Sequence, residues 1–405
     1  MTTAYHPGRA SADPPAPAAA PRPTAVALPM PTVRVRTAQA PPSAPSDPVD
    51  PAHSVDATRP VGASTSGTVP GGVWDGPLVD SFGRVHRDLR ISLTDKCNLR
   101  CTYCMPAEGL PWLAKENVLT TDEIERVARV LARLGIVEVR LTGGEPLLRP
   151  DIVDVVRRLH AIEGAEGPLD ISMTTNAIRL DRVMEDLEAA GLSRLNISLD
   201  TVDPERFKEL TRRERFSAVQ AGIAAARESG LRPLKINAVA MRGVNDDEFC
   251  DLLRFAIDHE AQLRFIEQMP LDAGHVWSRH TMVDGAEIFE KLSAEFDLDP
   301  VGDRGSSPAE VFRVRGTDAT VGVIASVTAP FCGACDRVRL TADGQLRNCL
   351  FAREESDLLS LLRSGGSDED VARMIRASIG AKRPGHGIDD PGFLQPDRPM
   401  SAIGG

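Results

Sequence analysis

Six short apolar segments alternate with amphipathic stretches between residues 89 and 268, and this alternation restricts the fold more than any other feature of the chain. Such alternation is typical of βα units, and helical crossovers between strands imply a parallel sheet. The predicted strands are Leu89–Leu93, Glu138–Leu141, Asp170–Thr174, Arg194–Leu199, Leu234–Ala240 and Leu263–Gln268. Six units are too few for a complete eight-stranded barrel. The sequence therefore predicts an α/β fold with a partial, open (β/α)6 barrel.

The segment between the first two predicted strands has the pattern of one amphipathic helix. Thr120 and Glu123 have the spacing of an N-terminal capping box, and Gly135 provides a helix-ending signal. Apolar residues recur between them on one helix face, at Ile124, Val127, Leu131 and Leu134. Because functional residues in parallel barrels gather at the carboxyl ends of the strands, we expect the site at that end.

The chain divides by composition into three parts. Residues 1–70 hold 15 of the 31 prolines and few large apolar side chains, so we predict a disordered extension. A transit peptide is the alternative, but this proline density opposes the amphipathic helix that it requires. Residues 80–280 are predicted to form the partial barrel. Residues 281–405 lose the βα alternation and are predicted to form a C-terminal cluster-binding region that closes the barrel mouth.

Charge and composition exclude several classes of function. The chain has 58 acidic and 47 basic side chains, a formal net charge of -11, and so no excess of cations for non-specific nucleic-acid binding. It contains no run of about 18 apolar residues that could cross a membrane, and its N-terminus lacks the apolar core of a secretory signal. We therefore predict a cytoplasmic protein without a nucleic-acid or membrane partner.

Three cysteines lie within eight residues directly after the first predicted strand. Cys97, Cys101 and Cys104 have the spacing Cys-x3-Cys-x2-Cys. Structural zinc takes four ligands, and the closest histidine, His86, lies before the strand. An iron–sulfur cluster held by three thiolates instead leaves one iron open for chemistry. This group is predicted to hold such a cluster, and a zinc knuckle that borrows a distant ligand is the alternative.

A second group of three cysteines lies in the C-terminal part. Cys332 and Cys335 form a Cys-x2-Cys pair and Cys349 follows, without a neighbouring histidine or a second pair. A redox pair or half of a zinc ribbon are alternatives, but a second cluster with an open iron that binds substrate fits three ligands better. Arg337 and Arg339 alternate along a predicted strand, so both point to one face beside the cysteines. Paired guanidinium groups suit phosphate recognition.

Three features resemble the radical S-adenosylmethionine superfamily. They are the first cysteine group, Tyr103 beside its last cysteine, and the Gly-Gly-Glu-Pro sequence at residues 143–146. In that superfamily three cysteines hold a [4Fe-4S] cluster, whose open iron chelates the amino and carboxylate groups of S-adenosylmethionine. One electron then cleaves the sulfonium and yields a 5'-deoxyadenosyl radical. A parallel sheet would place the cysteine loop and the Gly-Gly turn at the same carboxyl edge.

Both cysteine spacings, the arginine pair and the final Gly404-Gly405 resemble the GTP 3',8-cyclase family of molybdenum cofactor biosynthesis, from about Leu89 to Gly405. The resemblance implies two [4Fe-4S] clusters and S-adenosylmethionine as cofactors, and GTP as substrate. The radical would remove hydrogen from C3' of GTP, and the resulting C3' radical would attack C8 of guanine. Closure to 3',8-cyclo-7,8-dihydro-GTP also requires an electron and a proton.

The resemblance extends to partners but does not settle all of them. A downstream pterin synthase is expected to take the product. The electron donor stays unidentified, and whether the chain forms a homodimer stays open. GTP would place its guanine at the open iron of the second cluster, while cationic side chains hold its triphosphate.

The resemblance also assigns roles to individual residues. The metal ligands are Cys97, Cys101, Cys104, Cys332, Cys335 and Cys349. Contacts to S-adenosylmethionine are expected from Tyr103, Gly144, Glu145, Ser198 and Met269. Contacts to GTP are expected from Arg90, Arg140, Thr174, Lys235, Arg337, Val338 and Arg339. The catalytic set comprises Arg337, Arg339, Gly404 and Gly405. The two glycines are included because the glycine tail of that family reaches into the active site.

Two further residues receive a separate interpretation. Glu138 stands two residues before Arg140, where relatives often have a lysine, so we predict that one triphosphate contact is absent or replaced. Cys250 belongs to neither cysteine group and lies in an amphipathic stretch, so we assign it to packing.

Three other functions were weighed against this one. The nearest is a radical enzyme with an auxiliary cluster that modifies a peptide, whose auxiliary domain usually carries more cysteines. The second is a non-catalytic iron–sulfur or zinc-binding module, for which open coordination at both sites would have no use. The third is an ordinary GTPase, but the phosphate loop Gly-x4-Gly-Lys-Ser/Thr is missing.

Overall fold

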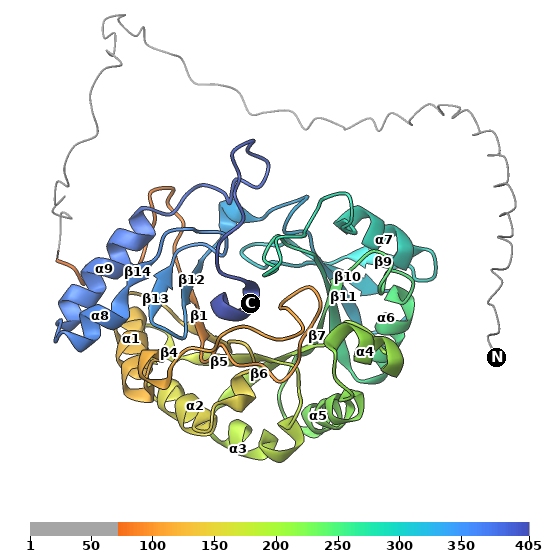
Figure 1. Cartoon of the computed structure of the whole chain (residues 1–405), viewed down its shortest axis with the longest axis horizontal. Helices are drawn as coiled ribbons and strands as arrows, with labels where there is room; N and C mark the ends of the chain where they lie inside the picture. The colour runs from red at the N-terminus through yellow and green to blue at the C-terminus, as the bar shows by residue number, and fades with distance from the viewer. Residues whose placement is uncertain (1–71, 405) are drawn as a thin grey trace, which may run out of the picture. The chain divides into compact units, whose positions relative to one another are not determined.

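The six predicted strands form the centre of one twelve-stranded sheet. The computed structural model describes residues 72–404, so the predicted extension over residues 1–70 and the terminal Gly405 lie outside the described residues. Six neighbouring parallel strands curve around the barrel interior (Figure 1). They are β1 (Asp88–Ser92), β2 (Glu138–Thr142), β5 (Asp170–Thr175), β6 (Leu192–Ser198), β7 (Leu234–Ala240) and β8 (Ala261–Glu267).

The strands form because their side chains alternate between two environments. In β1, Leu89 and Ile91 are fully buried in the hydrophobic core on the helix side of the sheet. Arg90 points to the other face, into the barrel interior. This period of two places apolar groups under the helices and polar groups inside the barrel.

Helices cover the outer face of the barrel (Figure 1). They are α1 (Thr121–Arg133), α2 (Ile152–His160), α3 (Met184–Ala189), α4 (Pro204–Thr211), α5 (Phe216–Glu228) and α6 (Phe249–Asp258). The predicted capping box at the start of α1 is confirmed, since Thr120 and Glu123 bond reciprocally. Gly135 follows the end of α1 with φ of 104°, a conformation that glycine adopts without strain. A short hairpin, β3 (Glu163–Gly164) with β4 (Gly167–Pro168), precedes β5.

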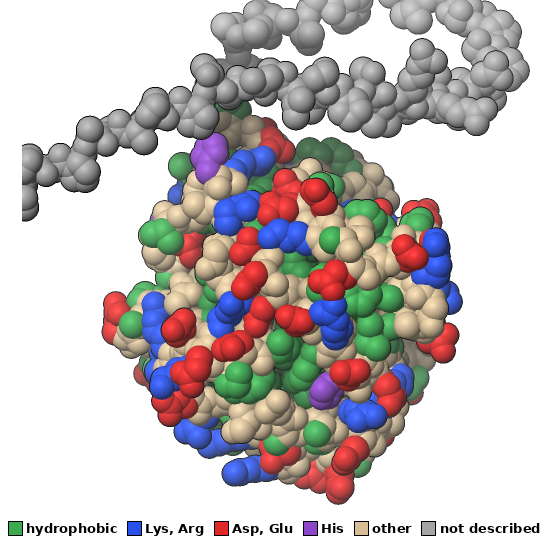
Figure 2. Space-filling view, turned by 90° about the vertical axis from the view of Figure 1, so that its right-hand side faces the viewer, with side chains coloured by type: hydrophobic (Ala, Val, Ile, Leu, Met, Phe, Trp, Pro, Cys, Tyr) green, Lys and Arg blue, Asp and Glu red, His purple; other side chains and the backbone are tan. Residues whose placement is uncertain are grey.

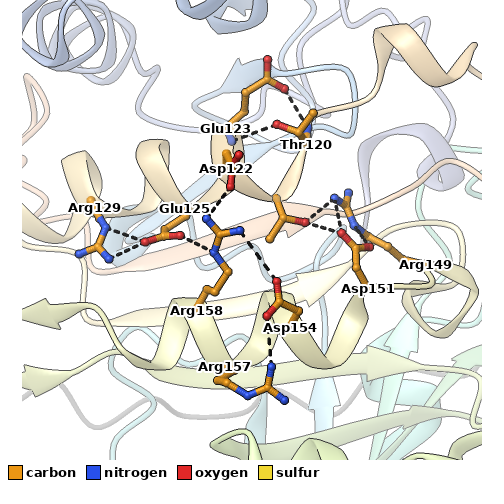
Figure 3. A network of polar contacts seen from close by, with 11 residues as sticks. Thr120, Asp122, Glu123, Glu125, Arg129, Arg149, Asp151, Asp154, Arg157 and Arg158 are labelled. Carbon is orange, nitrogen blue, oxygen red and sulfur yellow. Dashed lines mark hydrogen bonds and ion pairs between the residues drawn. The ribbon is translucent and has the colours of Figure 1, made fainter.

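An ion-pair network on the outer surface joins α1 to α2 (Figure 3). Arg158 of α2 donates to Glu125 and to Asp122 of α1, each at 2.5 Å, and Arg129 donates to the same Glu125 from within α1. These groups are largely exposed, so each pair contributes little. The apolar stripe of α1, fully buried against the sheet, holds the helix in place.

The C-terminal region extends the sheet at both edges. Its strands are β9 (Leu298–Pro300), β10 (Glu310–Val314), β11 (Thr320–Ile324), β12 (Arg337–Leu340), β13 (Gln345–Arg347) and β14 (Ser356–Asp357). β11 pairs in parallel with β8, and β12 pairs in parallel with β1. Eight neighbouring strands of the described sheet are therefore parallel, and antiparallel strands flank them on both sides. The barrel stays open, because β11 and β12 do not pair with each other.

The remaining helices of the C-terminal region lie on both sides of the opening. They are α7 (Gly285–Ser293), α8 (Leu358–Arg363), α9 (Asp368–Gly380) and α10 (Met400–Ile403). The last of these, α10, ends inside the ring of strands (Figure 1). Ile403 is buried there against Leu271 and Phe351. The prediction placed the C-terminal region at the barrel mouth, and this tail is the part that reaches it.

The surface shows no single-sign patch on the face that Figure 2 presents, where acidic and basic side chains alternate. Within residues 72–404, no helix has the length and apolar character needed to cross a membrane. Cys250 lies in α6, partly buried against the hydrophobic core, in keeping with its assignment to packing.

Candidate active site

One cavity of about 300 Å³ lies inside the ring of strands and collects most of the predicted site residues. The predicted residues that line it are Cys97, Cys101, Cys104, Tyr103, Gly144, Glu145, Ser198, Met269, Arg90, Arg140, Thr174, Arg337 and Arg339. They come from the first cysteine loop, from the carboxyl halves of the parallel strands and from β12. The two predicted sets, for S-adenosylmethionine and for GTP, therefore share one cavity.

The first cysteine loop is held by close backbone contacts to the Gly-Gly turn after β2. Gly144 donates its N–H to the Thr94 carbonyl at 2.7 Å. A Cβ atom at Gly144 would lie 2.4 Å from the Lys96 carbonyl oxygen. Only glycine fits such an approach, so Gly144 fixes the loop that carries Cys97 whatever else it contacts.

The three thiols of this loop form a set suited to a cluster. All three are free and line the cavity. Burial raises the pKa of Cys97 to about 12 and that of Cys104 to about 11, and the Cys104 thiolate further opposes ionisation of Cys97. Structural zinc takes four ligands, and within residues 72–404 no three or more His, Cys, Asp or Glu side chains are grouped as ligands of a single metal ion. Three thiolates are the ligands of a cluster that keeps one iron open. The donor set fits the cluster.

Two buried carboxylates face this loop. Asp200 accepts a hydrogen bond from the Tyr103 hydroxyl at 2.8 Å, and burial raises the pKa of Asp200 to about 6. Glu145 is 1% exposed and accepts from Thr175 Oγ1 at 2.7 Å and from the Asn176 N–H at 2.8 Å. Burial raises its pKa to about 7. Both residues combine a structural role with a place in the cavity lining.

The second cysteine group is assembled by a hairpin. Cys335 precedes β12 and Cys349 follows β13. These two strands pair antiparallel, so the start of β12 lies beside the end of β13 and the two cysteines come close together. Cys332 lies one turn before Cys335, and the loop that carries both connects β11 to β12 across the open side of the barrel. The three cysteines themselves do not line the cavity, although their neighbours Phe331 and Leu350 do.

The two cysteine groups lie at different levels of the barrel. Cys97 follows the carboxyl end of β1. In the parallel pairing of β1 with β12, Arg337 lies beside Asp88 at the amino end of β1, so Cys335 lies at that level. The C-terminal region therefore contributes its tail to the mouth and its cysteine loop to the open side.

A layer of arginines separates the two levels. In the sheet register Arg339 lies beside Arg90, and Arg90 lies beside Arg140, on three adjacent strands. Arg337 lies two residues earlier on the same face as Arg339, and its guanidinium is 4.5 Å from the Phe331 ring. The prediction that Arg337 and Arg339 share one face beside the cysteines agrees with this strand geometry.

These guanidinium groups are buried and crowd one another. Burial, followed by the charge of Arg140, lowers the pKa of Arg90 to about 9, and burial with Arg90 and Arg337 lowers that of Arg339 to about 9. The neighbouring carboxylate Asp88 is 3.7 Å from Arg90. Buried cations with so little compensation form a site prepared for a polyanion.

Arg264 is a further member of this layer that the sequence analysis missed. It lines the cavity from β8, lies beside Asn237 in the register and is 8% exposed. Burial, with the charge of Arg194, lowers its pKa to about 10. An arginine between the apolar residues Leu263 and Phe265 of a predicted strand was the signal available in the sequence.

Lys235 and Val338 lie outside the cavity lining. The Val338 side chain is fully buried in the hydrophobic core, because β12 turns its even positions away from the barrel interior. Only its backbone is available to a ligand. Lys235 is half-buried on β7, beside Asn196 of β6 in the register. Burial and the charges of Arg264, Arg194 and Arg140 lower its pKa to about 7.

Glu138 has a cationic partner in this chain. Arg194 donates to Glu138 at 3.2 Å and also pairs with Asp170. The acidic side chain of Glu138 is therefore paired with a neighbouring cation.

The C-terminal tail enters the layer directly. The Gly404 carbonyl accepts a hydrogen bond from Arg339 Nη1 at 2.8 Å. Gly404 has φ of 81°, and a Cβ atom there would lie 2.3 Å from Thr142 Oγ1. Gly405 lies outside the described residues. The glycine at position 404 is thus required by both its backbone conformation and the space around it.

Family models match most of the described chain. Residues 91–256 match the radical SAM superfamily, and residues 261–388 match the Molybdenum Cofactor Synthesis C family. The chain therefore belongs to the radical SAM enzymes, which act with an iron–sulfur cluster and S-adenosylmethionine.

Similar whole proteins narrow the class. A GTP 3',8-cyclase of Streptomyces coelicolor is 58% identical over 331 residues, which cover 81% of this chain and 96% of that protein. A GTP 3',8-cyclase of Corynebacterium glutamicum is 53% identical over 336 residues, which cover 81% and 89%. At this identity and coverage, the chain belongs to the GTP 3',8-cyclase family.

Proposed function

We propose that this chain converts GTP to 3',8-cyclo-7,8-dihydro-GTP in the cytoplasm, as the first step of molybdenum cofactor biosynthesis. The observation that carries the proposal is the layer of buried guanidinium groups between two three-cysteine groups. Arg90, Arg140, Arg264, Arg337 and Arg339 line the same cavity. A triphosphate supplies the negative charge that these residues lack.

We assign one [4Fe-4S] cluster to each cysteine group. Bound at Cys97, Cys101 and Cys104, a cluster would supply the electron that cleaves S-adenosylmethionine and so starts radical chemistry at C3' of GTP. Tyr103, Gly144, Ser198 and Met269 would contact S-adenosylmethionine at the mouth. Glu145 would contact its methionyl amino group, although its carboxylate already accepts three hydrogen bonds.

The protein's own residues orient GTP between the two levels. The arginine layer holds the triphosphate, together with Thr174 on the adjacent strand β5 and Lys235 on β7. The guanine is directed toward Cys332, Cys335 and Cys349. Arg339 contacts both the tail and the layer, so it couples the position of Gly404 to the presence of substrate. The position of the cavity inside the ring of strands limits the access of water to the carbon radical.

The test is an anaerobic reconstitution of the full chain with iron and sulfide. We expect about eight irons per chain, because two four-iron clusters bind. With dithionite, S-adenosylmethionine and GTP, 5'-deoxyadenosine and a cyclised guanosine product should appear together. About four irons, with 5'-deoxyadenosine but no change in GTP, would reject the substrate assignment.

The electron donor and the acceptor of the product are not identified by any residue of the chain. From the resemblance to the family, we expect a downstream pterin synthase to consume the product.

A further inference from the structure

A buried lysine lies against the second cysteine group. Lys382 follows α9 and is 3% exposed. Its Nζ is 3.5 Å from Cys335 Sγ and donates to the Arg337 carbonyl at 2.9 Å. The ammonium group therefore touches a thiol that the proposed function assigns to the second cluster.

His86 fixes the direction of this ammonium group. Its Nε2 lies 2.9 Å from Lys382 Nζ, and the ring is fully buried. Lysine Nζ can only donate, so His86 Nε2 accepts and the imidazole is neutral. Burial, together with the charge of Lys382, lowers the pKa of His86 to about 4, which agrees with that state.

No carboxylate compensates the charge of Lys382. Asp80 is the closest acid to His86, at 3.8 Å, but it forms a buried pair with Arg84 at 2.5 Å. Arg84 in turn donates to the Cys332 carbonyl at 2.7 Å. In residues 72–404, Lys382 has no acidic partner within ion-pair distance. Burial of an uncompensated ammonium is costly, so its negative partner must be the thiolates.

We propose that Lys382, oriented by His86, donates a hydrogen bond to the Cys335 sulfur of the second cluster and raises the reduction potential of that cluster. The inference rests on the proposed function, which places a cluster there. Hydrogen bonds to sulfur and nearby positive charge both favour the reduced, more negative form. Lys382 is thus a positioning residue that acts through Cys335 and does not contact GTP.

The test isolates the second cluster in the full chain. The triple variant Cys97→Ala, Cys101→Ala, Cys104→Ala leaves only the second cysteine group able to bind a cluster. About four irons per chain are therefore expected. Lys382→Met is then introduced, and the reduced and oxidised clusters are counted by electron paramagnetic resonance during a redox titration. Lys291→Met is the matched control, because Lys291 is also hydrogen-bonded but contacts none of the six cysteines.

At the midpoint of the parent variant, Lys382→Met should lower the ratio of reduced to oxidised cluster at least about tenfold, which is about 59 mV for one electron. Lys291→Met should leave the ratio unchanged. An unchanged ratio in Lys382→Met, with about four irons still bound, overturns the inference and leaves the proposed function standing. A triple variant without iron overturns the second cluster itself, and the inference with it.

A second measurement does not depend on the folding of the lysine variant. The triple variant is labelled with 15N at its lysine side chains and its cluster is reduced. Pulsed electron paramagnetic resonance should detect a weak coupling between the cluster spin and one 15N nucleus. Absence of that coupling overturns the hydrogen bond.

Discussion

The two cysteine groups contain the same ligands, but Cys101 of the first and Cys335 of the second lie in opposite electrostatic surroundings, while burial raises the pKa of Cys332 as it does in the first group. Around the first group, burial and then the carboxylate of Asp200 raise the pKa of Cys101 well above its usual range. Around the second, burial alone would raise the pKa of Cys335, but Arg337 and Lys382 outweigh it and lower the pKa to about 7. Ligand spacing in a sequence therefore says little about the electronic properties of a site.

This contrast agrees with two different tasks. Nearby carboxylates disfavour added negative charge, so a cluster at the first group is a stronger electron donor. Cations favour negative charge, so the second group suits a cluster that accepts an anionic nucleotide beside it. The following predictions test the contrast, from the largest expected effect to the smallest.

Loss of a first-group ligand should have the largest effect. Cys97→Ala should abolish formation of 5'-deoxyadenosine, because the electron for cleavage of S-adenosylmethionine comes from the cluster proposed at the first cysteine group. Cys335→Ala should retain cleavage and lose the cyclised product. Both products are measured by chromatography of anaerobic reactions. Equal loss of cleavage in the two variants would contradict the division of tasks.

Arg339→Ala should weaken GTP binding roughly tenfold to a hundredfold, since a hydrogen bond between charged groups contributes about 1.5–3 kcal/mol. Cleavage of S-adenosylmethionine should continue without matching product. Equilibrium binding and the ratio of product to 5'-deoxyadenosine measure the two effects. Arg315→Ala is the control, because Arg315 is exposed and pairs with Asp299. Normal conversion of GTP by Arg339→Ala would show that the substrate lies elsewhere.

Gly404→Ala should reduce the yield of cyclised product per 5'-deoxyadenosine several-fold while iron content stays unchanged. The added methyl group meets Thr142 Oγ1 and displaces the tail from Arg339. Gly380→Ala is the matched control, since no atom lies within 4 Å of its added methyl group. Removal of Gly404 and Gly405 together should act in the same direction. An unaffected yield would remove the tail from the reaction.

The affinity for GTP should fall as the pH rises above about 7. The pKa of Lys235 is about 7 in the free protein, and a bound triphosphate stabilises its ammonium form. Binding above that pH therefore takes up a proton, and the dissociation constant rises by up to about tenfold per pH unit for one such group. Lys235→Met should bind more weakly at pH 7 and lose this part of the slope. A wild-type affinity independent of pH between 7 and 9 would remove Lys235 from the triphosphate site.

Deletion of residues 1–70 should have the smallest effect. Both cysteine groups and the arginine layer belong to later residues, so iron content and the rate of product formation should stay unchanged. The purified truncated chain is compared with the full chain in the same assay. A collapse of activity would show that the extension belongs to the fold.

Local patterns were sufficient to predict the elements. The capping box at Thr120, the stripe of α1 and the six central strands were all predictable, because each depends on neighbouring residues alone. The six cysteines were equally visible by their spacing, and the arginine pair by its alternation.

Non-local pairing was beyond such patterns. Arg339, Arg90 and Arg140 form one layer only because β12 pairs with β1, and nothing in either segment specifies that choice. The sequence shows no histidine near the second cysteine group, yet the fold places His86 against Lys382, which in turn contacts Cys335. His386 is a second example, because its backbone lies against Cys332, where it partly opposes the burial that raises the pKa of this thiol. Residues far apart in the sequence were not predicted to be neighbours, although the barrel brings them together.

The pairing of β12 with β1 also has a consequence for biosynthesis. β1 is among the first strands to leave the ribosome, but its outer edge is paired only after residue 340 has been made. Until then an unpaired strand edge is exposed, and such edges promote association between chains. Products of premature termination before residue 337, where β12 begins, should therefore aggregate, and nascent chains should need a chaperone until β12 emerges.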